Sequence, residues 1–186
     1  MKKRLATLAM ALVVSVTAFA QTKTVKAEES TVTWKGYKVT GSHEGTVDLK
    51  SGTLKFDGDK LTGGQFTVDM TTIGSTDLEG EYKGKLDGHL KSEDFFGVEK
   101  YPNATLKITK VKATGKNSYK VTGDLTIKST TEPITFDMSV YGSKATATLK
   151  IDRSKYDVRY GSGSFFDGLG DKTIYDEFDL VVDLQF

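Results

Sequence analysis

The sequence of 186 residues contains no cysteine, only two prolines, two histidines and a single tryptophan. Without cysteine the protein has neither a disulfide framework nor a cysteine to which a lipid anchor is attached. Basic and acidic residues are mixed along the chain, so the basic patch typical of a nucleic-acid-binding protein is not expected. No segment after residue 20 is apolar enough to span a membrane as a helix, so we do not expect a membrane-spanning helical protein.

The first twenty residues, MKKRLATLAMALVVSVTAFA, have the pattern of a secretory signal peptide. A basic start precedes a short apolar run, and an A-x-A sequence ends just before Gln21. Cleavage there would remove three basic residues and change the formal net charge from +1 to −2. We therefore expect a periplasmic protein, with a short leader at 21–29 and a single domain over 30–186.

Apolar and polar residues alternate along most of this domain, which is the pattern of half-buried β-strands. The clearest run is FDLVVDLQF at the C-terminus, where Phe178, Leu180 and Val182 share one face. Turn signals, among them Ser51-Gly52 and Gly63-Gly64, separate such runs. Strands with one apolar face must close or stack, and closure also removes exposed edges. We therefore predict an all-β fold, an extended antiparallel lipocalin-like barrel of about eight strands.

One segment departs from this alternation. Leu78, Tyr82, Leu86 and Leu90 recur at a spacing of four, which is one stripe of a helix. Interspersed glycines weaken such a helix by roughly 1 kcal/mol each. We predict one short helical insertion around residues 77–96 that leans on the barrel.

Catalytic signals are weak. His43 and His89 are the only histidines, and they lack the spacing of a metal motif such as H-x-x-x-H. We assign no catalytic residue and no metal ligand, and we do not expect an enzyme. A small periplasmic enzyme or metalloprotein that uses His43 or His89 remains as an alternative.

Aromatic residues point instead to a ligand site. A barrel of about eight strands is either filled by side chains or holds one elongated ligand. Two double-phenylalanine loops, SEDFFG and GSGSFFDGLGD, place aromatic rings among small and polar residues that normally face water. We predict that Phe165 and Phe166 face inward as the apolar lips of a cavity, and that Phe95 and Phe96 anchor the helical segment against the wall. The alternative is that these rings only fill the core.

The two arginines after the signal peptide, Arg153 and Arg159, both lie just before the second double phenylalanine. Arginine binds phosphate or carboxylate in a bidentate manner, so an anionic head group near this loop is one interpretation. The other is ion pairing with Asp152, Asp157 or Asp176 at the rim of the barrel.

Several stretches of the chain resemble the YceI-like family of periplasmic lipid-binding proteins. They are VTWKGYKVTGSHEGTV, KLDGHLKSEDFFGVEKYPNATLKI, VTGDLTIKSTTEPITF and LKIDRSKYDVRYGSGSFFDGLGDKTIYDEFDLVVDL. The resemblance implies a lipocalin-like barrel whose interior holds a polyisoprenoid-type molecule, such as a prenyl pyrophosphate or a quinone tail. It places Asp87, His89 and Leu90 on the family's helix motif, and Arg153 and Tyr156 on its R-x-x-aromatic strand. Many members have Arg-Asp where this chain has Leu86-Asp87, so a head-group role for that arginine is absent here.

These observations favour a periplasmic carrier that encloses an apolar ligand: a polyisoprenoid, a quinone or a fatty-acid-like lipid. Apart from such a bound lipid or quinone, no cofactor is expected, and a homodimer is compatible with the sequence. An outer-membrane β-barrel is a further alternative, because the C-terminal FDLVVDLQF resembles the last strand of such barrels. The candidate ligand-binding residues are Trp34, Phe66, Phe95, Phe96, Phe136, Arg153, Tyr156, Phe165, Phe166 and Phe178.

Overall fold

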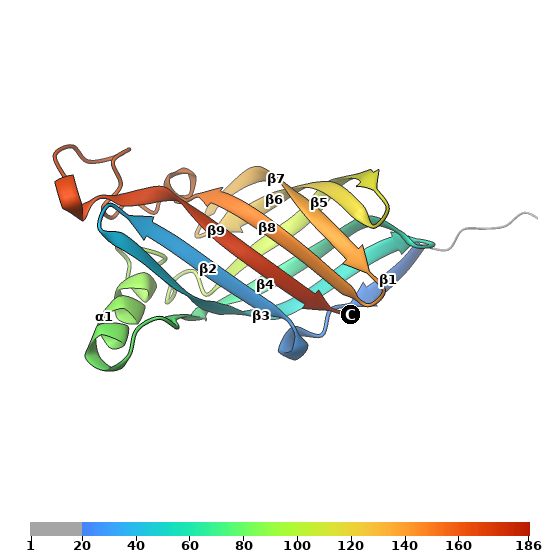
Figure 1. Ribbon diagram of the computed structural model, residues 1–186, viewed down its shortest axis with the longest axis horizontal. Helices are drawn as coiled ribbons and strands as arrows, with labels where there is room; N and C mark the ends of the chain where they lie inside the picture. The colour runs from blue at the N-terminus through green and yellow to red at the C-terminus, as the bar shows by residue number, and fades with distance from the viewer. Residues whose placement is uncertain (1–19) are drawn as a thin grey trace, which may run out of the picture.

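The computed structural model describes residues 20–186, and the predicted signal peptide lies outside them except for Ala20. Within this range nine antiparallel strands form one sheet, and a single α-helix, α1, lies at one end of it (Figure 1). The strands are β1 (Ala20–Thr24), β2 (Thr31–Lys38), β3 (Gly41–Asp57), β4 (Lys60–Ser75), β5 (Asn103–Gly115), β6 (Ser118–Ile127), β7 (Thr130–Tyr141), β8 (Lys144–Asp152) and β9 (Ile174–Gln185). Helix α1 spans Gly80–Lys91, and short 3-10 helices lie at Ala27–Glu29 (η1), Arg153–Tyr156 (η2) and Gly170–Lys172 (η3).

Strands β2 to β9 close into an eight-stranded antiparallel barrel, so the predicted fold class is confirmed. The order runs β3-β2-β9-β8-β7-β6-β5-β4, and the pairing of β4 with β3 completes the ring. Strand β1 pairs with the far half of β3, from Ala20 opposite Asp57 to Thr24 opposite Thr53. Part of the segment expected to be a leader is therefore a strand of the sheet.

Strands β3 and β4 are long and continuous, so the turns predicted at Ser51-Gly52 and Gly63-Gly64 are wrong. Both sites need glycine because another group comes close. A Cβ atom on Gly52 would lie 2.7 Å from Cδ1 of Phe66, and one on Gly64 would lie 2.6 Å from the carbonyl oxygen of Thr53. Glycine inside a strand often marks such a close approach rather than a turn.

The apolar face of the sheet points into the barrel. Along β8 the buried residues are Ala145, Ala147, Leu149 and Ile151, and the exposed ones between them are lysine or threonine. A membrane barrel has the reverse arrangement, with an apolar band outside and a polar lumen. The burial pattern therefore contradicts the outer-membrane alternative. Separately, none of the helices in the described part of the chain is both long and apolar enough to cross a bilayer.

Helix α1 lies within the predicted insertion at 77–96 and packs against the end of the barrel. Leu90 is buried and Leu86 is half-buried against the core, whereas Tyr82 is 74% exposed and does not belong to the buried stripe. The turn after the helix buries Phe95 and Phe96 in the cluster that joins Leu90 of the helix to the barrel wall, which agrees with their predicted anchoring role.

Candidate functional site

An internal cavity of about 130 Å³, which we call the first chamber, lies under helix α1 among the inward-facing side chains of the barrel. Its wall includes Leu90 at the end of the helix and the double phenylalanine that follows it. A second chamber of about 90 Å³ lies further along the barrel, towards Met138 and Leu184. The two share six wall residues: Val32, Val68, Ala104, Leu125, Ile151 and Leu180. Together they form an elongated apolar space along the barrel interior.

The size of these chambers sets what they hold without rearrangement. An engineered protein cavity of about 150 Å³ stays dry and takes up a benzene molecule. Each chamber is therefore of the size of one small apolar group, and a longer hydrocarbon requires wall side chains to change rotamer. Met70, which lines the first chamber, belongs to the residue type that adapts most readily.

A groove of about 100 Å³ lies between helix α1 and the β2–β3 hairpin, on the outer side of the first chamber. Its outer part is formed by Tyr37, Lys38, His43, Leu86 and His89. Five residues line both the groove and the cavity, namely Trp34, Gly36, Leu90, Phe95 and Ile174. These five residues, which we call the partition, separate the groove from the interior.

Arg153 is the one charged residue among those lining the first chamber, and its side chain is only 3% exposed. Its guanidinium donates hydrogen bonds to the backbone carbonyls of Val158 (2.8 Å), Ile174 (3.0 Å) and Tyr175 (3.2 Å). It also lies 3.4 Å from the carboxylate of Asp176. Burial lowers the pKa of Arg153, and the nearby carboxylates oppose that shift. These contacts agree with the ion-pair interpretation and tie η2 to the start of β9.

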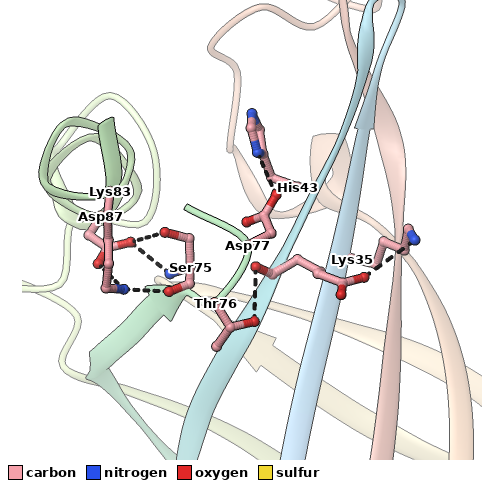
Figure 2. A network of polar contacts seen from close by, with 8 residues as sticks. Lys35, His43, Ser75, Thr76, Asp77, Lys83 and Asp87 are labelled. Atoms are coloured by element: carbon pink, nitrogen blue, oxygen red, sulfur yellow. Dashed lines mark hydrogen bonds and ion pairs between the residues drawn. The ribbon is translucent and has the colours of Figure 1, made fainter. Parts of the chain in front are cut away.

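Polar contacts attach helix α1 to the barrel rim (Figure 2). The carboxylate of Asp87 accepts hydrogen bonds from the backbone N–H of Ser75 (2.7 Å) and from its hydroxyl (2.9 Å). Lys83 bridges the same two residues, because it donates to Asp87 (2.8 Å) and to the carbonyl of Ser75. Burial alone would raise the pKa of Asp87, but these hydrogen bonds outweigh it and the pKa is lowered.

The chain just beyond Ser75 is attached to the β2–β3 hairpin (Figure 2). The Nδ1 atom of His43 lies 2.9 Å from the carboxylate of Asp77, and the backbone N–H of Thr76 donates to the carbonyl of Glu44. His89 stands edge-on to Tyr160, with ring centroids 4.2 Å apart. Each histidine thus has a structural contact. Within residues 20–186 no three His, Asp or Glu side chains form a cluster suited to a metal ion.

Comparison with known families decides the affiliation of this barrel. The YceI-like domain matches residues 24–186. The chain belongs to the YceI-like family. A UPF0312 protein of Pseudomonas putida is 36% identical over 98 residues, which is 53% of this chain and 49% of that protein. A UPF0312 protein of Vibrio parahaemolyticus is 33% identical over 100 residues, or 54% and 51% of the two chains. This YceI-like chain therefore matches about half the length of these curated relatives.

Solved structures share the fold. BcnA of Burkholderia cenocepacia superposes with a TM-score of 0.68 at 26% identity, over 86% of this chain and 98% of BcnA. A polyisoprenoid-binding domain of Saccharophagus degradans, implicated in plant cell wall breakdown, gives a TM-score of 0.57 at 14% identity, over 87% and 97%. A YceI protein of Campylobacter jejuni gives 0.55 at 17%, over 99% and 92%. The last two comparisons concern the fold alone.

The prediction that Phe165 and Phe166 face inward is wrong, because these residues are 40% and 49% exposed. The loop turns on itself, and the backbone N–H groups of both residues donate to the carbonyl of Ser162. The guanidinium of Arg159 lies 5.0 Å from the centre of the Phe165 ring, and Phe166 borders a surface cleft that shares no residue with the cavity. The partition under helix α1, not this loop, borders the interior of the YceI-like barrel.

The other candidate residues lie inside. The first chamber is lined by Trp34, Phe95, Phe96, Arg153 and Phe178, and the second by Phe66 and Phe136. Tyr156 is buried but lines neither chamber, and burial raises the pKa of its hydroxyl to about 12. That these residues contact a ligand stays a prediction.

The small and aliphatic residues that border both chambers were not among the predicted ligand-binding residues. Ala104 is the clearest example, since it is 6% exposed and lines both of them. The sequence feature that could have indicated such a site is a small residue on the predicted inward face of a strand whose other inward-facing residues are large.

Proposed function

We propose that this protein is a periplasmic carrier that encloses an isoprenoid-like or similar lipid in the barrel. The observation that carries the proposal is the pair of apolar chambers along the interior, bordered by Ala104 and five aliphatic residues. Membership in the YceI-like family and the fold shared with a polyisoprenoid-binding domain support it. The secretory pattern of residues 1–20 supports the periplasmic location.

Hydrophobic burial supplies the affinity in this proposal. Burying one CH₂ group contributes about 0.8 kcal/mol, so a five-carbon isoprene unit contributes on the order of 3–4 kcal/mol. About three or four buried units suffice for micromolar binding once the cost of association is subtracted. Because the chambers are small without a ligand, part of this energy goes into rearranging the wall.

The test is native mass spectrometry of protein exported from cells and purified without detergent. We expect a co-bound molecule with a long apolar chain, and an N-terminus at Gln21 in the periplasmic fraction. A protein that carries no lipid and does not take up an added prenyl probe would contradict the proposal.

A matched pair of variants on β5 ties the lipid to the chambers. Ala104→Leu places three more carbons where the two chambers meet, and we expect it to reduce the bound lipid strongly. Ala113→Leu makes the same change at an exposed site on the same strand and should leave the lipid unchanged. Equal retention by both variants would show that the lipid binds elsewhere.

A further inference from the structure

The indole of Trp34 carries a buried hydrogen-bond donor without an acceptor. Trp34 is 7% exposed, and its Nε1–H has no partner within residues 20–186. Buried indole N–H groups usually find a partner, because a donor removed from water and left unpaired is costly. Such an unpaired group in a wall that is apolar apart from Arg153 and Tyr175 calls for a functional explanation.

The position of Trp34 points to a ligand. Trp34 belongs to the partition and so lines both the groove under helix α1 and the first chamber. A ligand that occupies either space therefore lies beside the indole ring, whose N–H is buried and unpaired. Its chain then extends past Ala104 into the second chamber, away from the helix.

The other buried donor in the wall, the guanidinium of Arg153, is already engaged. Arg153 directs its guanidinium at three backbone carbonyls and lies beside Asp176. These hydrogen bonds give the Arg153 side chain a structural role in stabilising the wall. Of the buried side-chain donors that line the first chamber, the indole N–H of Trp34 is the one without a partner and so is available to a ligand oxygen.

We infer that the cavity selects an apolar chain that carries one hydrogen-bond acceptor oxygen, such as a ketone, over a pure hydrocarbon, and that Trp34 is the specificity-determining residue. This inference rests on the proposed function, since it names the chemistry of the lipid head. An ordinary net hydrogen bond changes affinity about five- to tenfold, which sets the size of the expected selection.

The test compares geranylacetone with the hydrocarbon in which a methylene replaces its carbonyl, both measured by displacement of a fluorescent apolar probe. Trp34→Phe removes the N–H and should lower the affinity for the ketone relative to that for the hydrocarbon about five- to tenfold. Phe178→Leu trims another ring of the same wall without removing a donor and should weaken both ligands by the same factor.

A second readout does not depend on any substitution. The chain has one tryptophan, so its ¹H–¹⁵N spectrum contains a single indole signal. The ketone should move the indole proton downfield, and the hydrocarbon should not.

Equal losses of both ligands in Trp34→Phe, or an indole signal that stays in place when the ketone displaces the probe, would overturn the inference and leave the carrier function intact. Failure of both ligands to bind the unmodified protein would overturn the carrier function as well.

Discussion

Asp87 on helix α1 accepts two hydrogen bonds from one residue, Ser75 at the end of β4, through its backbone N–H and its hydroxyl. Few apolar contacts hold this helix, since Leu90 is its one buried residue and Leu86 is half-buried. The hydrogen bonds between Asp87 and Ser75 therefore contribute much of the interaction that holds the helix over the partition.

We expect Asp87→Asn to lower the free energy of unfolding by about 1–2 kcal/mol at pH 7, because an ionised acceptor is replaced by a weaker one. The pKa of Asp87 is lowered in the folded state, so its stabilisation is present above the unfolded pKa of about 3.9 and is lost as the pH falls through the folded pKa. Urea unfolding at pH 7 and near pH 3 should show the difference between wild type and variant shrinking in acid. Glu81→Gln, in the exposed pair with Lys85, should change stability by less than about 0.5 kcal/mol at either pH.

Removing the guanidinium of Arg153 should destabilise the protein strongly. Arg153→Met leaves three backbone carbonyls without their donor and Asp176 without its cation. Breaking a buried pair from one side costs about 3–5 kcal/mol, and chemical denaturation would measure it. Arg159→Met is the control, since that arginine is 60% exposed. Similar, small effects of both substitutions would show that Arg153 does not hold the wall.

Gly45 is expected to be intolerant of a side chain. A Cβ atom there would lie 1.9 Å from the carbonyl oxygen of Gly74 and 2.7 Å from Cζ2 of Trp34. We expect Gly45→Ala to cost about 3 kcal/mol or more, because backbone and a large ring must both move. Gly36→Ala, on the facing strand, meets nothing within 4 Å and should be nearly neutral. Thermal unfolding of the two variants would compare them directly.

Substitutions in the exposed loop that contains Phe165 and Phe166 should have little effect on stability or on lipid binding. Replacing both Phe165 and Phe166 by serine should change stability by less than about 1 kcal/mol, since substitutions at exposed sites are usually small. Lipid retention should also stay the same, because neither residue lines a chamber. Phe95→Ser, which opens the partition, should reduce retention in the same mass-spectrometric assay. Loss of lipid from the loop variant would show that this loop does contribute to the binding site.

The local pattern of the sequence was sufficient to predict the architecture. Alternation along strands such as β8 and β9 depends only on neighbouring residues, so it predicts an all-β barrel and its inward face. The spacing of Leu86 and Leu90 likewise predicts helix α1. These features are recorded in consecutive residues and need no knowledge of which strands are paired.

Features that depend on the distances between strands could be determined only from the tertiary structure. Gly52 and Gly64 look like turns in the sequence, yet they lie inside strands because another group approaches them closely. The loop with Phe165 and Phe166 turns outward through hydrogen bonds to Ser162, which no periodicity predicts. The position of the cavity, with Ala104 between its chambers and the unpaired N–H of Trp34 in its wall, follows from how side chains of distant strands fill a closed ring. Alternation identifies which side chains point inward, but only their packing determines where they leave space.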